Sequence, residues 1–488
     1  MSTTNQNAAL DTNPEGAQIA DEARQIAARG EVAPPSPHQV SLGWALKEAL
    51  FAAIIALAMF TPVIGLLSVQ DISNRVILVT RWPLLFVVVA LVAIARFVIA
   101  YYLSPLLAAR RARPRVAVVQ VPAWRTALST YFPPVAILFL FAYPMIVLGT
   151  SGIAGSIKWV DNFGIQILIY VMLAWGLNVV VGLAGLLDLG YVAFYALGAY
   201  SYTLLAVNLD LSFWVCLPLA GLLAATWGVV LGFPVLRLRG DYLAIVTLAF
   251  GEIIRLVLIN WREVTNGGFG ITSIPKVTLF GIPFDASPEG FAKTFGLPLS
   301  SAYYKIFLYY LILLLALLTA VVTIRLRRLP IGRAWESLRE DEIACRSLGI
   351  NTTNTKLTAF AIGAMFGGFA GSFFAARQGF INPDSFTFLE SALIVAIVVL
   401  GGMGSMIGVA VAAAVMIGGI EILRELTFLK QIFGPDFNPT QYRMLLFGLA
   451  MVTIMLWRPR GFVSTRSPMV FLKERKAISA DLIGEGRG

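Results

Sequence analysis

The 488-residue sequence is 58% hydrophobic and only 13% charged, with a mean hydropathy of +0.80 and a net charge of +10. A water-soluble domain carries about twice this charged fraction, so that class is excluded. The apolar runs are continuous and about 20 residues long, which excludes the alternating pattern of a transmembrane β-barrel. We therefore predict an all-α, polytopic membrane bundle that uses the lipid bilayer as its solvent.

The N-terminal part is predicted to contain a tail and two spans. Residues 1–43 are polar and rich in Ala and Pro, lack a signal peptide, and are predicted to be disordered. Residues 44–130 form an N-terminal two-helix extension, with spans near Trp44–Ser68 and Trp82–Leu103. The only histidine lies in the tail and the two cysteines lie far apart, so no metal site is predicted.

Residues 131–460 form the predicted core, followed by a C-terminal tail over residues 461–488. Its spans lie near Pro133–Gly149, Phe163–Val181, Tyr191–Val207, Phe213–Leu236, Tyr242–Ile259, Tyr303–Ile324, Leu357–Ala376, Phe386–Leu400, Ile407–Leu423 and Tyr442–Trp457. Several are short or interrupted by glycine, so the prediction is about eleven or twelve spans in all.

Basic residues set the predicted orientation. Lys and Arg gather after the second span, at Leu236–Arg239, in the loop 325–356 and in the C-terminal tail. With twelve spans these clusters share one side, which the positive-inside rule makes cytoplasmic together with both termini. This bias accounts for the net charge, so no nucleic-acid partner is predicted. The longest loop on the other side, residues 261–300, is long enough to suggest a functional role.

Glycine repeats suggest close helix packing. Gly363, Gly367 and Gly371 recur every four residues, and Gly404 and Gly408 repeat the spacing. Small residues at this interval let helix backbones approach closely. Static packing and faces that slide during gating are both open interpretations.

A break is predicted in the fourth span at Gly182 and Gly185, which we assign to the same packing or gating group. Asp188 follows it. Two interpretations of this acid stay open: it caps the next helix, or it lines a solute path.

The sequence predicts no enzyme and no cofactor bound by this chain. A P-loop needs a Gly-Lys dipeptide, and none occurs. One histidine in the tail excludes Ser/His/Asp and Cys/His sets, and HExxH is absent. Any ATP used by this protein would be hydrolysed on another chain.

Residues 325–356 form a charged island between two apolar spans. Within it, Ile331–Gly349 is predicted to be one amphipathic helix that ends at Gly349 as a C′ glycine. The predicted apolar stripe is Ile331, Trp335, Leu338 and Ile343, and the predicted polar face is Arg333, Glu336, Arg339, Glu340, Asp341 and Glu342. A helix lying on a membrane would prefer a basic polar face, so the mixed charge favours docking to a protein partner.

Five blocks of sequence resemble one family. They are GRAWESLREDEIACRSLGIN, GFINPDSFTFLESALIVAIVVLGGMGSMIG, GLAGLLDLGYVAFYALGAYSY, LRGDYLAIVTLAFGEIIRLVLINW and TNGGFGITSIP. They resemble the membrane permease of branched-chain amino acid ABC importers, LivM type, over about Ile157 to Gly461. The first two spans resemble the N-terminal extension of many such permeases.

The resemblance implies an ABC importer permease fold in the bacterial inner membrane, working by alternating access. A second, LivH-type permease, two ATPase chains that hold ATP and Mg²⁺, and a periplasmic amino-acid-binding protein would complete the transporter. The substrate would meet broken-helix residues near Asn178, Asp188 and Tyr191.

The island would be the coupling helix seated on an ATPase subunit. The residues assigned to this contact are Arg333, Trp335, Glu336, Arg339, Glu340, Asp341, Glu342 and Gly349. ABC importers commonly carry an EAA---G pattern here. Glu342-Ile343-Ala344 precedes Gly349 by one residue more than that pattern, which leaves the docking residues open.

Two alternatives are kept. A urea or short-amide ABC permease shares the general pattern, although the N-terminal extension favours amino acids. A stand-alone secondary transporter would need a chain of buried acids, which the predicted spans do not show.

Overall fold

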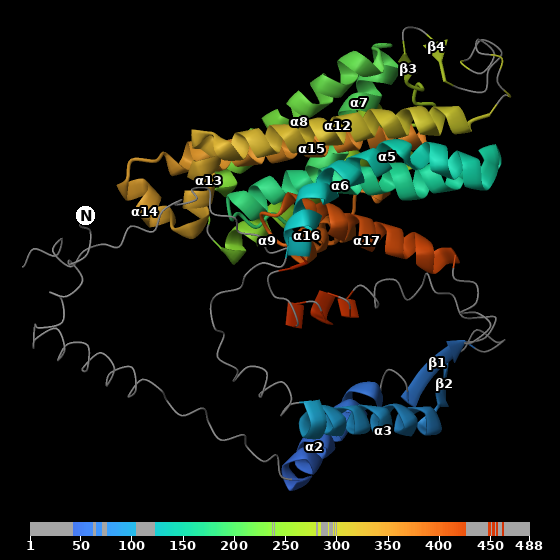
Figure 1. The fold of residues 1–488 in the computed structure, drawn as a ribbon, viewed down its shortest axis with the longest axis vertical. Coiled ribbons are helices and arrows are strands. Elements are labelled where there is room, and N and C mark those ends of the chain that lie inside the picture. Colours follow the sequence, from blue (N-terminus) through green and yellow to red (C-terminus); the bar gives the residue numbers. More distant parts are fainter. Residues whose placement is uncertain are drawn as a thin grey trace, which may run out of the picture. The chain divides into compact units, whose positions relative to one another are not determined.

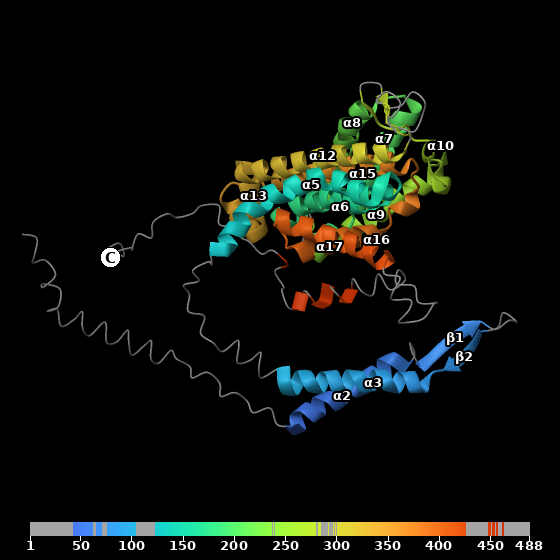
Figure 2. The ribbon, with the colours of Figure 1, turned by 45° about the vertical axis from the view of Figure 1, so that its right-hand side comes forward.

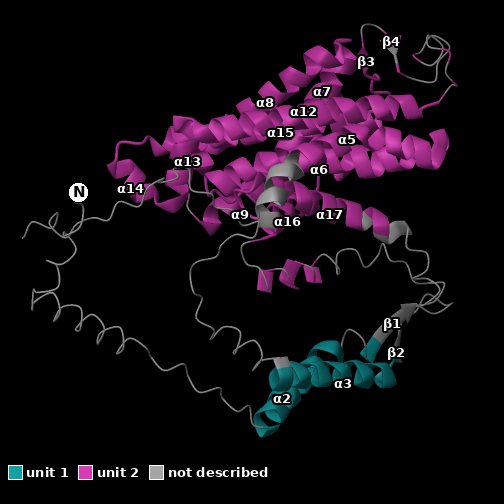
Figure 3. Cartoon of the chain, viewed as in Figure 1, with its two compact units in different colours: residues 1–128 teal, residues 129–488 magenta. Residues whose placement is uncertain are grey.

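The computed structural model describes residues 42–61, 65–70, 76–103, 123–236, 238, 240–279, 282–284 and 300–425, with single positions between 291 and 298 and short stretches between 448 and 462. The chain forms two compact units, residues 1–128 and 129–488 (Figures 1 and 3). Each unit is described by itself. The predicted tails, residues 1–41 and most of the chain after residue 425, lie outside the described residues.

The first unit is a helical pair with a short hairpin. Helix α2 (Leu42–Phe60) and helix α3 (Trp82–Val98), which the π-helical η2 (Ile99–Leu103) continues, flank the antiparallel strands β1 (Leu66–Gln70) and β2 (Val76–Thr80). Arg96 of α3 pairs with Glu48 of α2 at 2.8 Å. The first predicted span is therefore wrong at its end: the helix stops at Phe60, since the position before Pro62 disfavours helix, and Ser68 lies in a strand.

The chain passes from the first unit into the second within a long helix, and two consecutive helical spans are joined end to end there. Helix α5 (Ala123–Lys158) bends at Gly152, whose φ of 68° and ψ of 179° are not helical. The π-helical η3 (Trp159–Ile165), α6 (Gln166–Leu177) and the π-helical η4 (Asn178–Leu183) follow. The chain then leaves helical geometry until α7, which confirms the break predicted near Gly182 and Gly185.

The other helices of this unit are α7 (Val192–Asn208), α8 (Phe213–Val235), α9 (Asp241–Asn260), α10 (Arg262–Thr265), α12 (Ala302–Arg328), α13 (Pro330–Glu340), α14 (Glu342–Ser347), α15 (Thr352–Gln378), α16 (Phe388–Gly401) and α17 (Met406–Glu425). The short elements are η5 (Gly267–Phe269), η6 (Pro383–Ser385) and the antiparallel pair β3 (Thr278–Leu279) and β4 (Ile282–Pro283). Helix α13 lies at one end of the bundle, which we call the island end (Figures 1 and 2). Helix α10 and the β3–β4 pair lie at the opposite end, which we call the loop end.

The described residues contain eight helices that are long and apolar enough to cross a membrane, and two shorter apolar helices. One of the eight, Pro134–Leu183, spans 50 residues and contains the third and fourth predicted spans. The first eleven predicted segments each overlap a described helix, and the twelfth lies mostly outside the described residues. The polytopic helical bundle is thus confirmed.

Helix α15 is largely buried and packs against α6, α7 and α8. Its backbone touches that of α7: a Cβ added at Gly198 would lie 2.2 Å from the Gly368 oxygen. On the α8 side, a Cβ at Gly228 would lie 2.7 Å from the Cβ of Ala364. Small residues therefore set the helix spacing in the middle of the bundle.

Candidate functional site

The charged island contains two helices, so the single predicted helix is wrong. Asp341 takes an extended conformation (φ −157°, ψ 111°) between α13 and α14. Its carboxylate accepts hydrogen bonds from the backbone N–H groups of Ile343 (2.8 Å) and Ala344 (3.0 Å). Asp341 is thus the N-cap of α14, and a residue that caps a new helix cannot continue the previous one.

Trp335 anchors α13 to the bundle. Its side chain is fully buried, and its Nε1–H donates to the backbone oxygen of Thr355 at 3.0 Å and to the hydroxyl of Thr358 at 3.2 Å. Gly332 allows the close approach, because a Cβ there would lie 2.3 Å from the Leu326 oxygen. Leu338 is buried on the same face. This face therefore belongs to the core, and α13 is fixed to α12 and α15.

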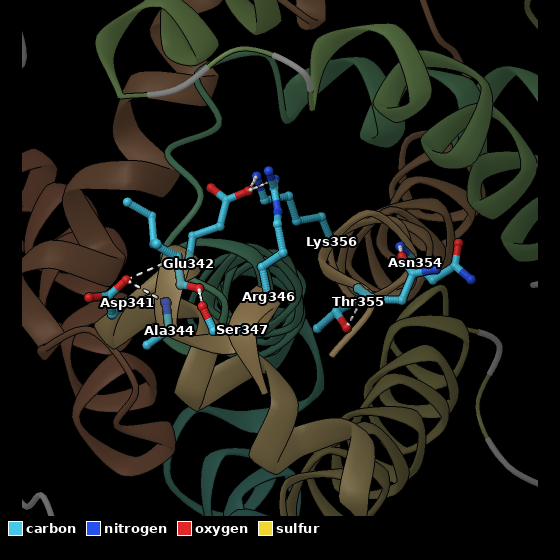
Figure 4. A network of polar contacts seen from close by, with 10 residues as sticks. Asp341, Glu342, Ala344, Arg346, Ser347, Asn354, Thr355 and Lys356 are labelled. Carbon is cyan, nitrogen blue, oxygen red and sulfur yellow. Dashed lines mark hydrogen bonds and ion pairs between the residues drawn. The ribbon is translucent and has the colours of Figure 1, made fainter. Parts of the chain in front are cut away.

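Two island carboxylates have partners inside the chain. Glu336 pairs with Arg327 at 2.6 Å. Glu342 pairs with the buried Lys356 at 2.9 Å and lies 3.5 Å from Arg346 of its own helix (Figure 4). Both acids were assigned to the ATPase contact, and the structure shows that each also holds the island onto the bundle.

The outward face of the island mixes charged and apolar groups. Arg333, Glu340 and Asp341 are exposed. So are Ile343 at 68% and Leu348 at 81%. The assignment of Ile343 to the buried stripe is wrong, because the break at Asp341 changes the helix phase. Large exposed aliphatic side chains beside charges are typical of a docking surface.

Gly349 ends α14 as predicted. Its φ is 81°, a region that favours glycine. The N–H of Gly349 bonds to the Arg346 oxygen and that of Ile350 to the Cys345 oxygen, which is the Schellman pattern.

Arg339 connects the island to the broken span. Its Nη1 donates to the backbone oxygen of Gly182 in η4. Gly185 (φ 74°) leaves room for this side chain, since a Cβ there would lie 2.8 Å from Arg339 Cγ. Gly404 (φ 89°), in the turn between α16 and α17, lies on the same side, where an added Cβ would be 3.4 Å from Arg339 Nη1. Three segments that are distant in sequence therefore meet at one guanidinium group.

Two of the three predicted pathway residues form hydrogen bonds to segments that are distant in sequence. Asn178 is 1% exposed, and its Oδ1 accepts from the N–H of Gly404 at 2.8 Å. Tyr191 is fully buried, and its hydroxyl donates to the Gly363 oxygen at 2.8 Å. These bonds hold η4 and the start of α7 to their neighbours. A role in the pathway stays a prediction for both residues.

Asp188 lies in the irregular segment between η4 and α7 and is 1% exposed. Its Oδ1 accepts from the N–H of Gly190 at 2.9 Å, so it caps a turn rather than α7, which begins at Val192. Its Oδ2 is buried without a hydrogen-bond partner among the described residues. It borders a cavity of about 20 Å³ next to Thr247, large enough for one water molecule.

The glycine repeats lie at helix contacts. A Cβ at Gly371 would lie 2.2 Å from the Tyr195 oxygen of α7, and one at Gly367 would lie 3.2 Å from Phe194 Cβ. At Gly363 the distance to Val180 would be 2.6 Å. Gly182 and Gly408 are equally confined, with added Cβ atoms 2.6 Å from the Gly404 nitrogen and 2.1 Å from the Gly401 oxygen. Their use in gating stays a prediction.

A charged cluster that was not predicted from the sequence lies at the loop end. Asp161 of η3 lies 2.7 Å from Arg377 of α15 and 3.2 Å from Lys305 of α12. Arg377 also donates to Asn162 and Gln166. Single charges at span ends were the only signal, and their pairing across 216 residues has no local pattern. By contrast, Glu252 and Arg255 lie one helical turn apart in α9, a spacing that allows pairing within one helix, and they pair at 3.1 Å.

Comparisons with known proteins agree over most of the chain. Residues 159–455 match the family model for a branched-chain amino acid transport system permease component, and residues 44–143 match a domain of unknown function. The chain is 55% identical over 315 residues to the high-affinity branched-chain amino acid transport system permease protein LivM of Salmonella typhimurium and 54% identical to that of Escherichia coli K12. Each alignment covers 64% of this chain and 71% of the relative. The permease protein LivH of Escherichia coli K12 is 24% identical over 303 residues, 60% of this chain and 91% of the relative. No solved structure gave a significant match.

Proposed function

Since this chain belongs to the family of branched-chain amino acid transport system permease components, we propose that it is the LivM-type membrane subunit of an ATP-driven importer of branched-chain amino acids. It is an integral membrane protein and a transporter subunit rather than an enzyme. Neither alternative, a urea or short-amide permease or a stand-alone secondary transporter, gains support from its relatives.

The structure of the island is the observation that best supports the ATP-driven mechanism. Helices α13 and α14 are anchored inward through Trp335 and Lys356 and present Arg333, Ile343 and Leu348 outward. Because the island is fixed to α12 and α15, a displacement that a partner imposes on the island is transmitted to these two helices. We infer that this face docks on an ATPase subunit, which would hold the ATP and Mg²⁺.

The partners follow from the same proposal. A LivH-type permease would complete the pathway, two ATPase chains would drive it, and a periplasmic binding protein would deliver the amino acid at the loop end. The basic residues at the end of α12, Arg325, Arg327 and Arg328, favour a cytoplasmic island end. The bacterial inner membrane and cytoplasmic termini are part of this proposal.

Transport would occur by alternating access between two packings of the bundle. ATP drives the switch only if ATP-bound partners contact the two packings differently. The Arg339 contact with Gly182 is a direct route from the island to the broken span η4.

Purification and reconstitution test this function. We expect ATPase subunits to co-purify with this chain. Proteoliposomes that hold the complex should accumulate leucine only with ATP on the ATPase side and binding protein on the other. Accumulation of leucine by this chain alone would contradict the proposal.

A further inference from the structure

A half-buried carboxylate without an ion-pair partner among the described residues lies toward the loop end of the bundle. Glu390 is in the first turn of α16, and its Oε2 accepts a hydrogen bond from the hydroxyl of Tyr170 in α6. Its Oε1 has no hydrogen-bond partner, and no Lys or Arg nitrogen lies within 4.0 Å, among the described residues. Asp161, by contrast, is neutralised by the basic side chains of Arg377 and Lys305. A carboxylate removed from water is costly unless a cation compensates it.

Two tyrosines of α7 have hydroxyl groups without a partner in the described part of the chain, and one of them lies near this carboxylate. Tyr195 is 3% exposed and lies within electrostatic range of Glu390 and of Arg377, and its hydroxyl has no hydrogen-bond partner among the described residues. The hydroxyl of Tyr200 is buried and has no partner there either. A buried hydroxyl normally finds a partner, so the unpaired hydroxyl of Tyr200 points to a ligand that the chain does not supply, and the hydroxyl of Tyr195 is available to the same ligand.

The same region contains an apolar wall. The Tyr195 ring lies 5.4 Å from that of Phe374 and 5.2 Å from that of Phe386, and Phe374 and Phe386 are 5.7 Å apart. The Tyr200 ring is 6.1 Å from Phe386. These residues come from α7, α15 and the segment before α16. Aromatic faces attract both ammonium groups and aliphatic side chains.

We propose that Glu390 and the hydroxyl of Tyr195 bind the α-ammonium group of an amino acid inside the membrane. Phe374 and Phe386 receive its apolar side chain. The ammonium supplies the ion pair that Glu390 lacks among the described residues, and the rings favour an aliphatic over a polar side chain. This assignment rests on the proposed function. It places substrate recognition in the permease as well as in the binding protein, and at residues other than Asn178, Asp188 and Tyr191.

The test uses the complete transporter in proteoliposomes and measures radiolabelled leucine taken up per ATP hydrolysed. In Glu390→Gln we expect this ratio to fall about tenfold, because a hydrogen bond to a charged group is lost, while ATP hydrolysis stimulated by the loaded binding protein continues. Glu390→Asp keeps the charge and should recover part of the ratio. Asp241→Asn, the same loss of charge at an exposed site in the first turn of α9, should stay within about twofold of wild type.

A normal ratio in Glu390→Gln overturns the assignment. If that variant fails to assemble, Tyr195→Phe decides, since it removes only a hydroxyl: the ratio should fall about threefold, and an unchanged ratio overturns the assignment. A wild-type complex that moves no leucine would instead contradict the proposed function, and with it the cargo named here.

Discussion

Lys356 shows how one residue joins the island to the bundle. Its side chain is only 5% exposed, and its Nζ lies 2.9 Å from Glu342 Oε1. A buried cation is stable in such a position only with a counter-charge. Glu342 is therefore a structural partner of α15, which explains why an acid of the island points inward (Figure 4).

The Glu342–Lys356 pair predicts that a double substitution destabilises the protein less than the single substitution of Glu342. Glu342→Gln leaves Lys356 buried without its carboxylate and should cost about 3 kcal/mol, whereas adding Lys356→Met removes the charge and should restore most of the loss. The thermal midpoint of the purified complex measures both. Glu263→Gln, at an exposed position of α10 away from the island, is the matched control. A double variant no more stable than Glu342→Gln would show that the pair is not the cause.

At the scale of helices, the glycines of α15 and α17 differ in how much space a neighbouring atom leaves for an added Cβ. An added Cβ at Gly371 would lie 2.2 Å from a backbone oxygen, which cannot move without shifting α7. At Gly367 the nearest atom would be a side-chain carbon at 3.2 Å, and at Gly419 of α17 nothing lies within 4 Å.

These distances predict a graded series of alanine substitutions. Gly371→Ala should lower the yield of assembled complex strongly, and Gly367→Ala only slightly. Gly419→Ala should be neutral or stabilising by up to about 1 kcal/mol through helix propensity. Gel filtration of the detergent-solubilised complex and its thermal midpoint give the ranking. Equal effects at Gly371 and Gly419 would mean that the contact between α7 and α15 is loose.

Helix α14 carries the exposed aliphatic groups of the island. We expect Ile343→Asp with Leu348→Asp to abolish co-purification of ATPase subunits while the chain still inserts, because the apolar centre of the docking surface is lost. Phe269→Asp changes a residue that is 81% exposed at the loop end and should keep the ATPase subunits bound. Retention of the ATPase subunits by the island variant would show that the docking surface does not include Ile343 and Leu348.

Across the whole molecule, hydropathy predicted the spans well because each apolar run is a local property of the chain. It could not place Asp161 beside Arg377 or Tyr170 beside Glu390, since such pairs depend on how distant helices pack. The break at Asp341 was missed for another reason. Charge patterning favoured one helix, and the capping tendency of an aspartate inside a charged run was overlooked.

The charged cluster and the Arg339 contact hold opposite ends of the helical stretch formed by η3, α6 and η4. Asp161 of η3 is tied to Lys305 and Arg377, whereas Gly182 of η4 is tied to Arg339. Helix α6 runs between η3 and η4. A movement of the island therefore reaches α6 through one guanidinium group, while the other end of that helix stays fixed.

Arg339 is thus expected to couple ATP hydrolysis to transport without contacting ATP or substrate. Arg339→Gln keeps most of the side chain but loses the charge-assisted bond to Gly182, so leucine uptake per ATP hydrolysed should fall about tenfold while ATPase subunits still co-purify. Arg325→Gln, an exposed position in the last turn of α12, makes the same chemical change and should leave the ratio unaltered. Reconstituted complexes measured for uptake and hydrolysis together separate coupling from assembly. If Arg339→Gln takes up as much leucine per ATP hydrolysed as the wild type, the Arg339 contact does not couple the island to η4. The movement of the island would then reach the bundle through Trp335 and α15.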